Sequence, residues 1–284
     1  MTRPVNIIDS HLEETIMNII QQNFFALLHT GAFGRENGPL EPMSLYKWNR
    51  LFQIIKEQNV ASYALKGTRG HQYDPLVKIP KEFIDNLTKC AEQEQDNAEP
   101  PVLTNYFLGR RLKNIQENER HTMDASMDTL HLLNIIVSNV SGMLNRGFPL
   151  RGIIKLGSFL RNQGDKVDFL KLEKWLKTLH LQRLAQLEGS ILMEKFKFEK
   201  AEIPFVHEEE PAARKLLERS INHTAMDTAE EWHFRQSRSG FVHNNTTVLR
   251  KNLRRSMRYI GYAPLETISN FIHNFTRSLS EIEE

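Results

Sequence analysis

The stretch LGSFLRNQGDKVDFL (156–170) holds the residues best suited to catalysis. A Gly-Ser turn such as Gly157–Ser158 can hold a nucleotide phosphate. Asp165 and Asp168, a few residues further on, could bind the divalent metal ions that activate an attacking hydroxyl and neutralise a leaving group. Ser158, Asp165 and Asp168 are therefore a candidate catalytic set for metal-dependent nucleotidyl transfer.

The spacing of the two carboxylates favours a structural role instead. In that chemistry the acidic residues lie at i and i+2 of a strand, because alternate side chains of a strand share one face. Here they lie at i and i+3, and Gly157 and Ser158 fall within a helical pattern. Asp168 is also well placed to cap a helix. We predict a helix-turn-helix with no catalytic residue, and Ser158, Asp165 and Asp168 remain the alternative.

The histidines and the single cysteine predict no metal site. None of the eleven histidines has the His-x-x-x-His or Glu-x-x-His spacing that places two ligands on one helix face. Cys90 alone excludes an internal disulfide and a cysteine-built metal site. The run HEEEP (207–211) fits a helix start at Pro211, with its glutamates near the positive end of the helix dipole. We expect neither a metal ion nor a cofactor.

The segment GTRGHQYD (67–74) is a second candidate site. Its glycines suggest a flexible loop, and Arg69 and His71 could bind an anion there. A plain surface turn explains the same residues.

The strongest local concentration of charge lies near the C-terminus. On a helix, the basic residues would alternate with Leu249, Leu253, Met257 and Ile260, giving an apolar stripe beside a basic one. The basic residues are Arg250, Lys251, Arg254, Arg255 and Arg258. The pattern has two interpretations: a helix docked through its apolar stripe, or a surface that contacts phosphates or anionic lipid headgroups.

Composition places the chain among ordinary globular proteins. Its 284 residues carry 37 Lys and Arg against 35 Asp and Glu, so the net charge of +2 indicates no global electrostatic partner. A lone thiol and the absence of an apolar signal-peptide core in MTRPVNIIDSHLEE favour the cytoplasm. We expect no transmembrane segment, because no apolar run approaches the necessary length of about 18 residues.

Apolar residues recur every three to four positions along most of the chain, which predicts helices. Such stripes cover residues 12–28, 45–55, 80–91, 107–115, 130–144, 150–160, 169–179, 181–196 and 211–221. We expect Gly31 and Gly34 to end the first helix, and only residues 203–207 and a few isolated runs could form strands. The predicted fold is all-α: an irregular multi-helix bundle, possibly in two lobes.

Residues 1–91 are expected to form an N-terminal helical segment and residues 102–284 a C-terminal one. The polar, proline-ended stretch 92–101 between them is typical of an exposed linker. Residues 222–246 are rich in His, Asn, Thr and Arg with little periodicity, which indicates a long polar loop. The two segments could also form one compact domain.

Three regions resemble the uncharacterised nucleotidyltransferase family of bacteria. FFALLHTGAFGR (24–35) with residues 48–65 is similar to the opening helices of that family. Residues 146–192 resemble the helices that follow its catalytic core. RKNLRRSMRYIGYAPLE (250–266) resembles its C-terminal basic helix and the Tyr-Ala-Pro that follows. Together the three regions cover about half of the chain.

The catalytic core implied by this resemblance would fall within residues 76–127, which is too short for a domain of about 100 residues. The interval also lacks a Gly-Ser turn and an Asp-x-Asp pair. The resemblance therefore implies a degenerate relative, a pseudoenzyme from which no catalytic residue carries over.

Three hypotheses of function follow. The leading one is a non-catalytic helical binding or scaffold protein that engages a protein partner. The second is a divergent metal-dependent nucleotidyltransferase that uses Ser158, Asp165 and Asp168. The third is an adaptor that binds nucleic acid or an anionic membrane through the basic C-terminal helix. A continuous helix around Gly157 would favour a binding protein, and a strand-turn-strand would favour an enzyme.

Overall fold

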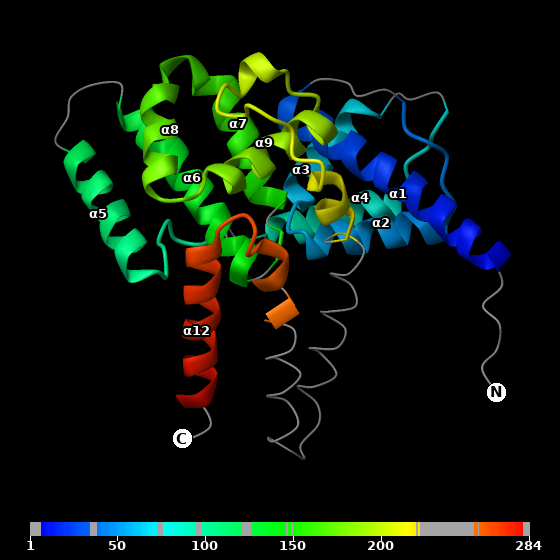
Figure 1. Ribbon diagram of the computed structural model, residues 1–284. Coiled ribbons are helices and arrows are strands. Elements are labelled where there is room, and N and C mark those ends of the chain that lie inside the picture. The colour runs from blue at the N-terminus through cyan, green and yellow to red at the C-terminus, as the bar shows by residue number, and fades with distance from the viewer. Residues whose placement is uncertain are drawn as a thin grey trace. The chain divides into compact units, whose positions relative to one another are not determined.

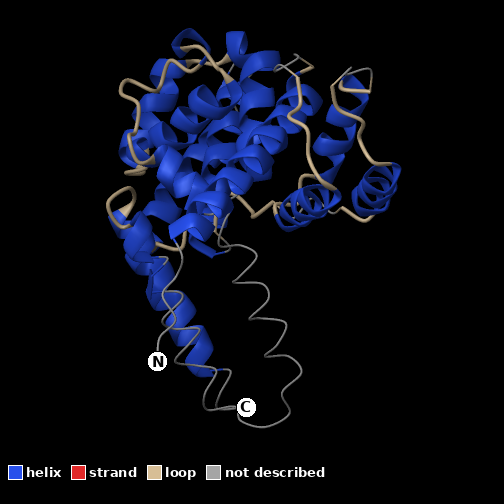
Figure 2. Cartoon of the chain, turned by 90° about the vertical axis from the view of Figure 1, so that its right-hand side faces the viewer, coloured by secondary structure: helices blue, strands red, loops and turns tan. Residues whose placement is uncertain are grey.

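Figure 1 shows the computed structural model of the chain, which describes residues 7–34, 39–72, 76–94, 98–120, 126–145, 147–148, 150–219, 221, 253–254 and 256–280. Within these ranges every regular element is a helix, and the coloured part of Figure 2 contains no strand. The predicted all-α fold is confirmed. The possible strand at 203–207 was wrong: the N–H of Ile203 bonds to Lys200 O and that of Val206 to Ile203 O, so both residues lie in tight turns.

The chain divides into two compact units, Met1–Asp96 and Asn97–Glu284. The boundary between them falls within residues 92–101. Each unit has its own set of buried apolar side chains and is described by itself. The polar segment 222–246 lies outside the described residues.

The described residues of unit 1 form four helices: α1 (Ile7–Phe33), α2 (Leu45–Glu57), α3 (Ala61–Gly70) and α4 (Lys81–Glu92). The apolar stripes predict α1, α2 and α4, whereas α3 was not predicted. Apolar side chains of all four helices form the core of the unit. Trp48 in α2 and Phe83 in α4 pack with ring centroids 4.8 Å apart. The core also includes Phe24, Leu27, Leu51, Ile55, Ala64 and Leu87.

Glycines allow α1 and α3 to approach at backbone distance. A Cβ atom on Gly31 would lie 1.8 Å from the carbonyl oxygen of Tyr63, and one on Gly67 would lie 2.0 Å from that of Leu27. Gly31 therefore does not end the first helix, which continues to Phe33. Gly67 likewise belongs to α3 and not to a loop. Both corrections have one cause: at these positions glycine provides room for close packing, while Gly34, with φ of 66°, follows the helix end.

The end of unit 1 returns to the start of α3. The carboxylate of Glu94 accepts hydrogen bonds from the backbone N–H groups of Ala61 (2.7 Å) and Ser62 (3.1 Å). These N–H groups have no partner within the helix, because the first turn of a helix leaves its donors unpaired. Glu94, within the stretch predicted to be a linker, thus acts as a capping group for α3.

Unit 2 contains α5 (Tyr106–Arg120), α6 (Ser126–Asn145), α7 (Leu150–Gln163), α8 (Phe169–Thr178), α9 (Gln182–Phe196) and α12 (Pro264–Ser280). Two short 3₁₀ helices, η1 (Gly164–Lys166) and η2 (Lys200–Glu202), follow α7 and α9. The body of the unit is built by α6 to α9, whose buried residues include Leu133, Val137, Ile154, Leu176 and Leu187. In Figure 1, α12 (red) projects from this body. No helix in the described ranges is long and apolar enough to cross a membrane.

Candidate functional site

The residues predicted as an alternative catalytic set lie around the end of α7 and the start of α8. Gly157 and Ser158 are inside α7, where the helix is continuous, and Gly157 is buried. Their backbone N–H groups lie in the interior of a helix, where each N–H bonds to the carbonyl four residues earlier, and so they form no phosphate-binding turn. The arrangement is the helix predicted from the spacing.

The two carboxylates that follow are exposed, and one of them caps a helix. Asp165 lies in η1. Asp168 precedes α8, where its side chain accepts a 3.0 Å hydrogen bond from the N–H of Lys171. Its own N–H donates to Oγ1 of Thr129 in α6, at 2.9 Å. The predicted N-cap role of Asp168 is confirmed, and one oxygen of its carboxylate is engaged in the cap.

Within the described ranges, no group of three or more His, Cys, Asp or Glu side chains is arranged to hold a metal ion. In the HEEEP run, Glu210 is committed to structural contacts that are described below. Burial raises the pKa of the half-buried Cys90 thiol, and the nearby Glu94 raises it further. Cys90 is therefore held as the thiol and lacks the low pKa of a reactive cysteine.

Arg69 and His71, the possible anion pair, have separate environments. His71 is buried, and its Nε2 lies 3.1 Å from the hydroxyl of Thr30 in α1, so the ring helps to hold α3 against α1. Arg69 is exposed at the C-terminal end of α3 and lines a cavity.

The basic C-terminal cluster is described only in part. Arg250, Lys251 and Arg255 lie outside the described residues, as does Leu249, whereas Arg254 and Arg258 are exposed on a helical segment.

The expectation that the apolar stripe of this segment docks on the core was wrong in its described part. Leu253, Met257 and Ile260 are all exposed, by 44%, 67% and 43%. Tyr259 and Ala263 are buried instead. Because side chains at 253, 257 and 260 share one face, the buried Tyr259 turns that face toward solvent.

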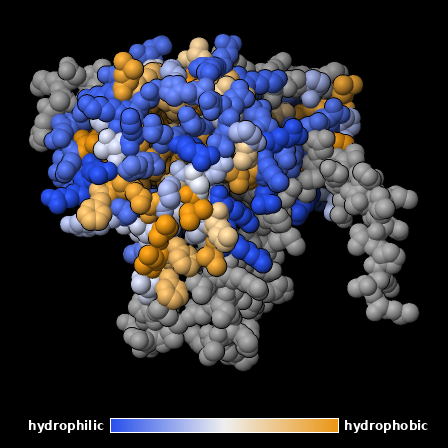
Figure 3. All heavy atoms as spheres, viewed as in Figure 1, coloured by the Kyte–Doolittle hydropathy of each residue, from blue (hydrophilic) through white to orange (hydrophobic). Residues whose placement is uncertain are grey.

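The helix α12 presents its faces in the opposite sense to an ordinary surface helix. Its polar side chains Glu266, Thr267 and Asn270 are buried, with exposures of 2%, 1% and 5%. Its apolar side chains are exposed by 39–54%, and they recur at intervals of three and four residues. These are Leu265, Ile268, Ile272 and Phe275, called here the α12 apolar face. Figure 3 shows hydrophobic residues gathered where Figure 1 places this helix.

Hydrogen bonds across the polar face explain why α12 is oriented in this way. The Glu266 carboxylate accepts from the N–H of Thr104 (2.5 Å) and of Asn105 (3.0 Å), just before α5 begins. The Asn105 side chain donates to the hydroxyl of Ser269 at 2.8 Å. Asn270 donates to Oδ1 of Asn145, at the end of α6, at 2.9 Å. A buried polar group is costly unless it is hydrogen-bonded, so these partners fix which face of α12 points inward.

The turn before α12 is also fixed to the body of unit 2. Arg183 in α9 donates to the carbonyl oxygen of Gly261 at 2.8 Å and lies 3.5 Å from the carboxylate of Glu210. The hydroxyl of Tyr262 donates to Glu210 at 3.2 Å. Burial raises the pKa of Tyr262, and the Glu210 carboxylate raises it further, so the phenol remains a donor. The start of α12 is thus held at several points, and its apolar face stays uncovered.

Sequence reasoning missed this surface. The spacing of Leu265, Ile268, Ile272 and Phe275 signals an amphipathic helix, and from that pattern alone the apolar side would be assigned to the core. The usable signal is on the other side of the helix, where Glu266, Asn270 and Asn274 recur every four residues. Such a row of polar side chains can form hydrogen bonds with the ends of neighbouring helices.

Two further aromatic side chains are exposed close to the contacts of Glu266. Tyr106 and Phe107, at the start of α5, are each 71% exposed, and their ring centroids are 5.5 Å apart. They directly follow Thr104 and Asn105, which bind Glu266. The start of α5 therefore adds aromatic surface near the first turn of α12.

Comparison of the chain with protein families, with curated proteins and with solved structures finds no match.

Proposed function

We propose that this chain is a non-catalytic helical binding protein whose α12 apolar face docks on a partner. The single observation that carries the proposal is the orientation of α12. Its buried hydrogen bonds hold the polar face inward, so the four apolar side chains face solvent. Contiguous exposed apolar surface of this kind marks interaction sites in folded proteins.

The spacing of the exposed residues favours an amphipathic helix of another protein as the partner. Leu265, Ile268, Ile272 and Phe275 are separated by three, four and three residues, the repeat by which two helices pack along a common seam. Among the described residues, the exposed polar neighbours His273 and Thr276 carry no fixed charge. A neutral border does not select an anionic surface, whereas it is compatible with a helix-helix contact.

The size of the surface fits an interaction of moderate strength. Complete burial of one Leu, Ile or Phe side chain contributes about 1.5–3 kcal/mol, and these four are already half-buried, so their further burial contributes several kcal/mol in total. Part of that is offset by the rotational and translational freedom lost on association. Contacts from Tyr106 and Phe107 would add to it.

The settings of the candidate catalytic residues support a non-catalytic role. Gly157 and Ser158 are interior residues of α7, and Asp168 serves as a cap. Descent from a nucleotidyltransferase-like family, with loss of its core, stays a prediction. Incubating the full chain with each nucleoside triphosphate, Mg²⁺ or Mn²⁺ and mixed acceptors is expected to give no product. A labelled product that is lost in Asp165→Asn or Asp168→Asn would contradict the non-catalytic assignment.

The docking proposal is tested by an affinity pull-down with quantitative mass spectrometry. The test variant Ile268→Asp/Ile272→Asp places charge on the α12 apolar face, and the control His273→Asp/Thr276→Asp places the same charge on its exposed polar flank. We expect a protein that is retained by the wild type and the control and lost from the test variant, with all three melting alike. Equal retention by all three would overturn the proposal.

A second copy of this chain is the competing occupant, and sedimentation analysis decides between the two. We expect a monomer over a range of concentrations. A dimer that dissociates in Ile268→Asp/Ile272→Asp would mean that the α12 apolar face is a homodimer contact.

One observation favours a second candidate function, attachment to an anionic membrane surface. Exposed Arg254 and Arg258 lie on the same helical segment as exposed Leu253, Met257 and Ile260, the combination typical of helices that lie in a lipid interface. Apolar side chains beside the cations favour lipid over nucleic acid.

Flotation with vesicles tests the membrane candidate. We expect binding to vesicles containing phosphatidylserine, none to pure phosphatidylcholine, and loss with Arg254→Glu/Arg258→Glu or with added salt. Binding that is equal for both vesicle types would contradict it.

A further inference from the structure

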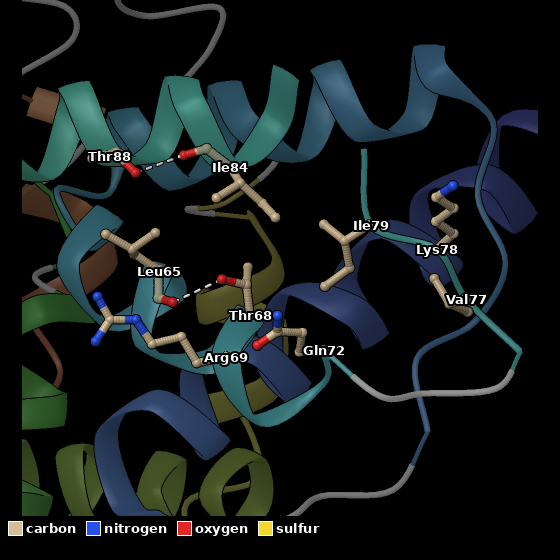
Figure 4. Close-up of a pocket in the computed structure, with 9 residues that line it drawn as sticks. All are labelled: Leu65, Thr68, Arg69, Gln72, Val77, Lys78, Ile79, Ile84 and Thr88. Atoms are coloured by element: carbon tan, nitrogen blue, oxygen red, sulfur yellow. Dashed lines mark hydrogen bonds between the residues drawn. The ribbon is translucent and has the colours of Figure 1, made fainter. Parts of the chain in front are cut away.

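Unit 1 contains a cavity of about 370 Å³ that the α12 contacts do not involve. Its walls come from α3, from α4 and from the segment 77–79 that precedes α4. Figure 4 shows the lining side chains, with those of Ile79, Ile84, Thr68 and Gln72 turned toward the middle of the cavity. The volume is at the lower end of the range of small-molecule sites.

Part of the cavity wall is apolar. Leu65 from α3, Ile84 from α4, and Val77 and Ile79 from the connecting segment line it. Ile79 and Ile84 are partly exposed, although they lie between two packed helices. An apolar ligand body would cover them and gain the free energy of removing that surface from water.

The polar lining of the cavity consists mainly of acceptors and of groups that can rotate. The hydroxyl of Thr68 donates to Leu65 O at 2.7 Å, and that of Thr88 donates to Ile84 O at 2.9 Å, as the dashed lines in Figure 4 mark. Both hydroxyls therefore have only lone pairs left for a ligand. Gln72, which is exposed, adds an amide that can donate or accept.

Among the described residues that line the cavity, the charged ones are Arg69 and Lys78, and both are cations. Both cations are exposed, and Figure 4 places them at opposite sides of the cavity. Figure 4 shows their charged ends turned away from the middle of the cavity, and because both side chains are exposed they can rotate toward a bound ligand.

The wall that carries Arg69 and Thr68 is held firmly. Close contact of Gly67 with the backbone of α1 fixes α3, and the bond between His71 and Thr30 fixes the end of that helix. A wall that does not need to rearrange lowers the entropic cost of binding. The cavity is thus preformed on its α3 side, with a cation at its edge.

We propose that this cavity binds an organic carboxylate with an apolar body, of the size of a medium-chain fatty acid. Charge complementarity supports an anion, since the charged groups among the described lining residues are two cations. The apolar side chains in the wall favour a hydrocarbon body, which would cover them, over a sugar or a nucleotide, whose polar surface would lose water against them. This site lies in unit 1 and is independent of the α12 apolar face.

Three probes of one chain length test the proposal: octanoate, 1-octanol and octylamine, each titrated into the full chain by calorimetry or followed by amide chemical shifts. We expect octanoate to bind most tightly, octanol more weakly and octylamine most weakly. The shifted amides are expected in α3, in α4 and at 77–79. Absence of octanoate binding, or octylamine binding as tightly as octanoate, overturns the proposal.

Variants separate binding in the cavity from binding elsewhere. The double change Arg69→Gln/Lys78→Gln is expected to weaken octanoate about fivefold to tenfold, the effect of losing two exposed cations, and to leave octanol unchanged. The control Lys66→Gln/Lys89→Gln removes the same charge from α3 and α4 at exposed residues that do not line the cavity. It is expected to retain binding.

A variant that fills the cavity completes the test. Ile79→Trp places a larger side chain into the space, and it is expected to abolish binding of both octanoate and octanol. Unit 1 should stay folded, because Ile79 lies outside the helices and is partly exposed. Octanoate binding that persists in folded Ile79→Trp, or that is equal in both charge variants, overturns the proposal.

Discussion

The side chain of Asn139 in α6 donates a 2.8 Å hydrogen bond to Oε2 of Glu188 in α9, and both residues are buried in unit 2. Gly152 in α7 makes room for this pair, since a Cβ atom there would lie 1.9 Å from Oδ1 of Asn139. Burial raises the pKa of Glu188 well above its ordinary value, and the bond from Asn139 only partly opposes this. Glu188 is therefore held as the neutral acid in the folded protein.

Because of this pair, we expect the stability of unit 2 to depend on pH and to be higher in acid than at neutral pH. The pKa of Glu188 is higher in the folded state than in the unfolded state, so its stabilising contribution is complete below the unfolded value near 4.5 and is lost as pH rises through the folded value. Relative to Glu188→Gln, which does not titrate, the wild type should lose stability as pH rises. Hydrogen exchange of α6 and α9 amides between pH 5 and 8 measures the difference.

Glu209→Gln is the control for that experiment, because Glu209 is exposed in the same unit. We expect Glu209→Gln to match the wild type in the hydrogen exchange of α6 and α9. A pH dependence shared by Glu188→Gln and the wild type would contradict the buried neutral acid.

The close approach of α1 and α3 predicts a severe effect of Gly67→Ala. The added methyl group would lie 2.0 Å from the backbone oxygen of Leu27, which belongs to a packed helix and has no rotamer to change. We expect a loss of about 1–3 kcal/mol, the usual cost of overpacking, with faster hydrogen exchange in α1 and α3. Gly164→Ala is the control, since nothing lies within 4 Å of its Cβ position. If both variants melt alike, the close contact is not important for stability.

The cap at Asp168 predicts that stability depends on whether the residue at this position can accept a hydrogen bond. Asp168→Ala should destabilise unit 2 by about 1 kcal/mol, because the N–H of Lys171 loses its acceptor, whereas Asp168→Ser should be nearly neutral. Chemical denaturation followed by circular dichroism measures both variants. Equal damage by Ser and Ala would mean that the carboxylate itself is needed, and the metal-binding alternative would regain support.

The exposure of the segment before α12 predicts that Leu253→Asp is tolerated. Leu253 is 44% exposed, so a charge there keeps its water, and the change in unfolding free energy should stay within about 0.5 kcal/mol. Tyr259→Ala should cost about 3 kcal/mol, because Tyr259 is 4% exposed and its removal leaves a cavity. Thermal melting compares the two. If Leu253→Asp were more destabilising than Tyr259→Ala, the apolar stripe would be the buried face of this segment.

The anchoring of α12 predicts that Glu266→Ala releases the helix. The N–H groups of Thr104 and Asn105 would both lose their acceptor, at a cost of about 1–3 kcal/mol. Hydrogen exchange should accelerate at residues 104–108 and along α12, and stay unchanged in α7 and α8. Ser269→Ala is the milder comparison, because it removes one bond between side chains only. Unchanged exchange in Glu266→Ala would show that other contacts hold α12.

The sequence by itself determined most of the helical segments. Apolar residues at intervals of three and four predict the helices from α1 to α9 except α3, because a helix needs a stripe of that period to bury one side. No such stripe predicts α3, and its last turn was expected to be a loop. The cap at Asp168 could also be predicted from the sequence, since the acceptor and the N–H of Lys171 are only three residues apart. Both features depend on residues close together in the chain.

Only the tertiary structure decided how those helices use their faces. The bond from Thr104 to Glu266 joins residues 162 positions apart, and it turns the polar face of α12 inward against the expectation from its pattern. Gly31 and Gly67 are of a residue type that is typical of helix ends and loops, yet both lie where the backbones of α1 and α3 come into close contact. The cavity likewise combines residues from α3, α4 and the segment between them. A local pattern records that a helix has two faces, but which face is buried depends on partners supplied by distant parts of the chain.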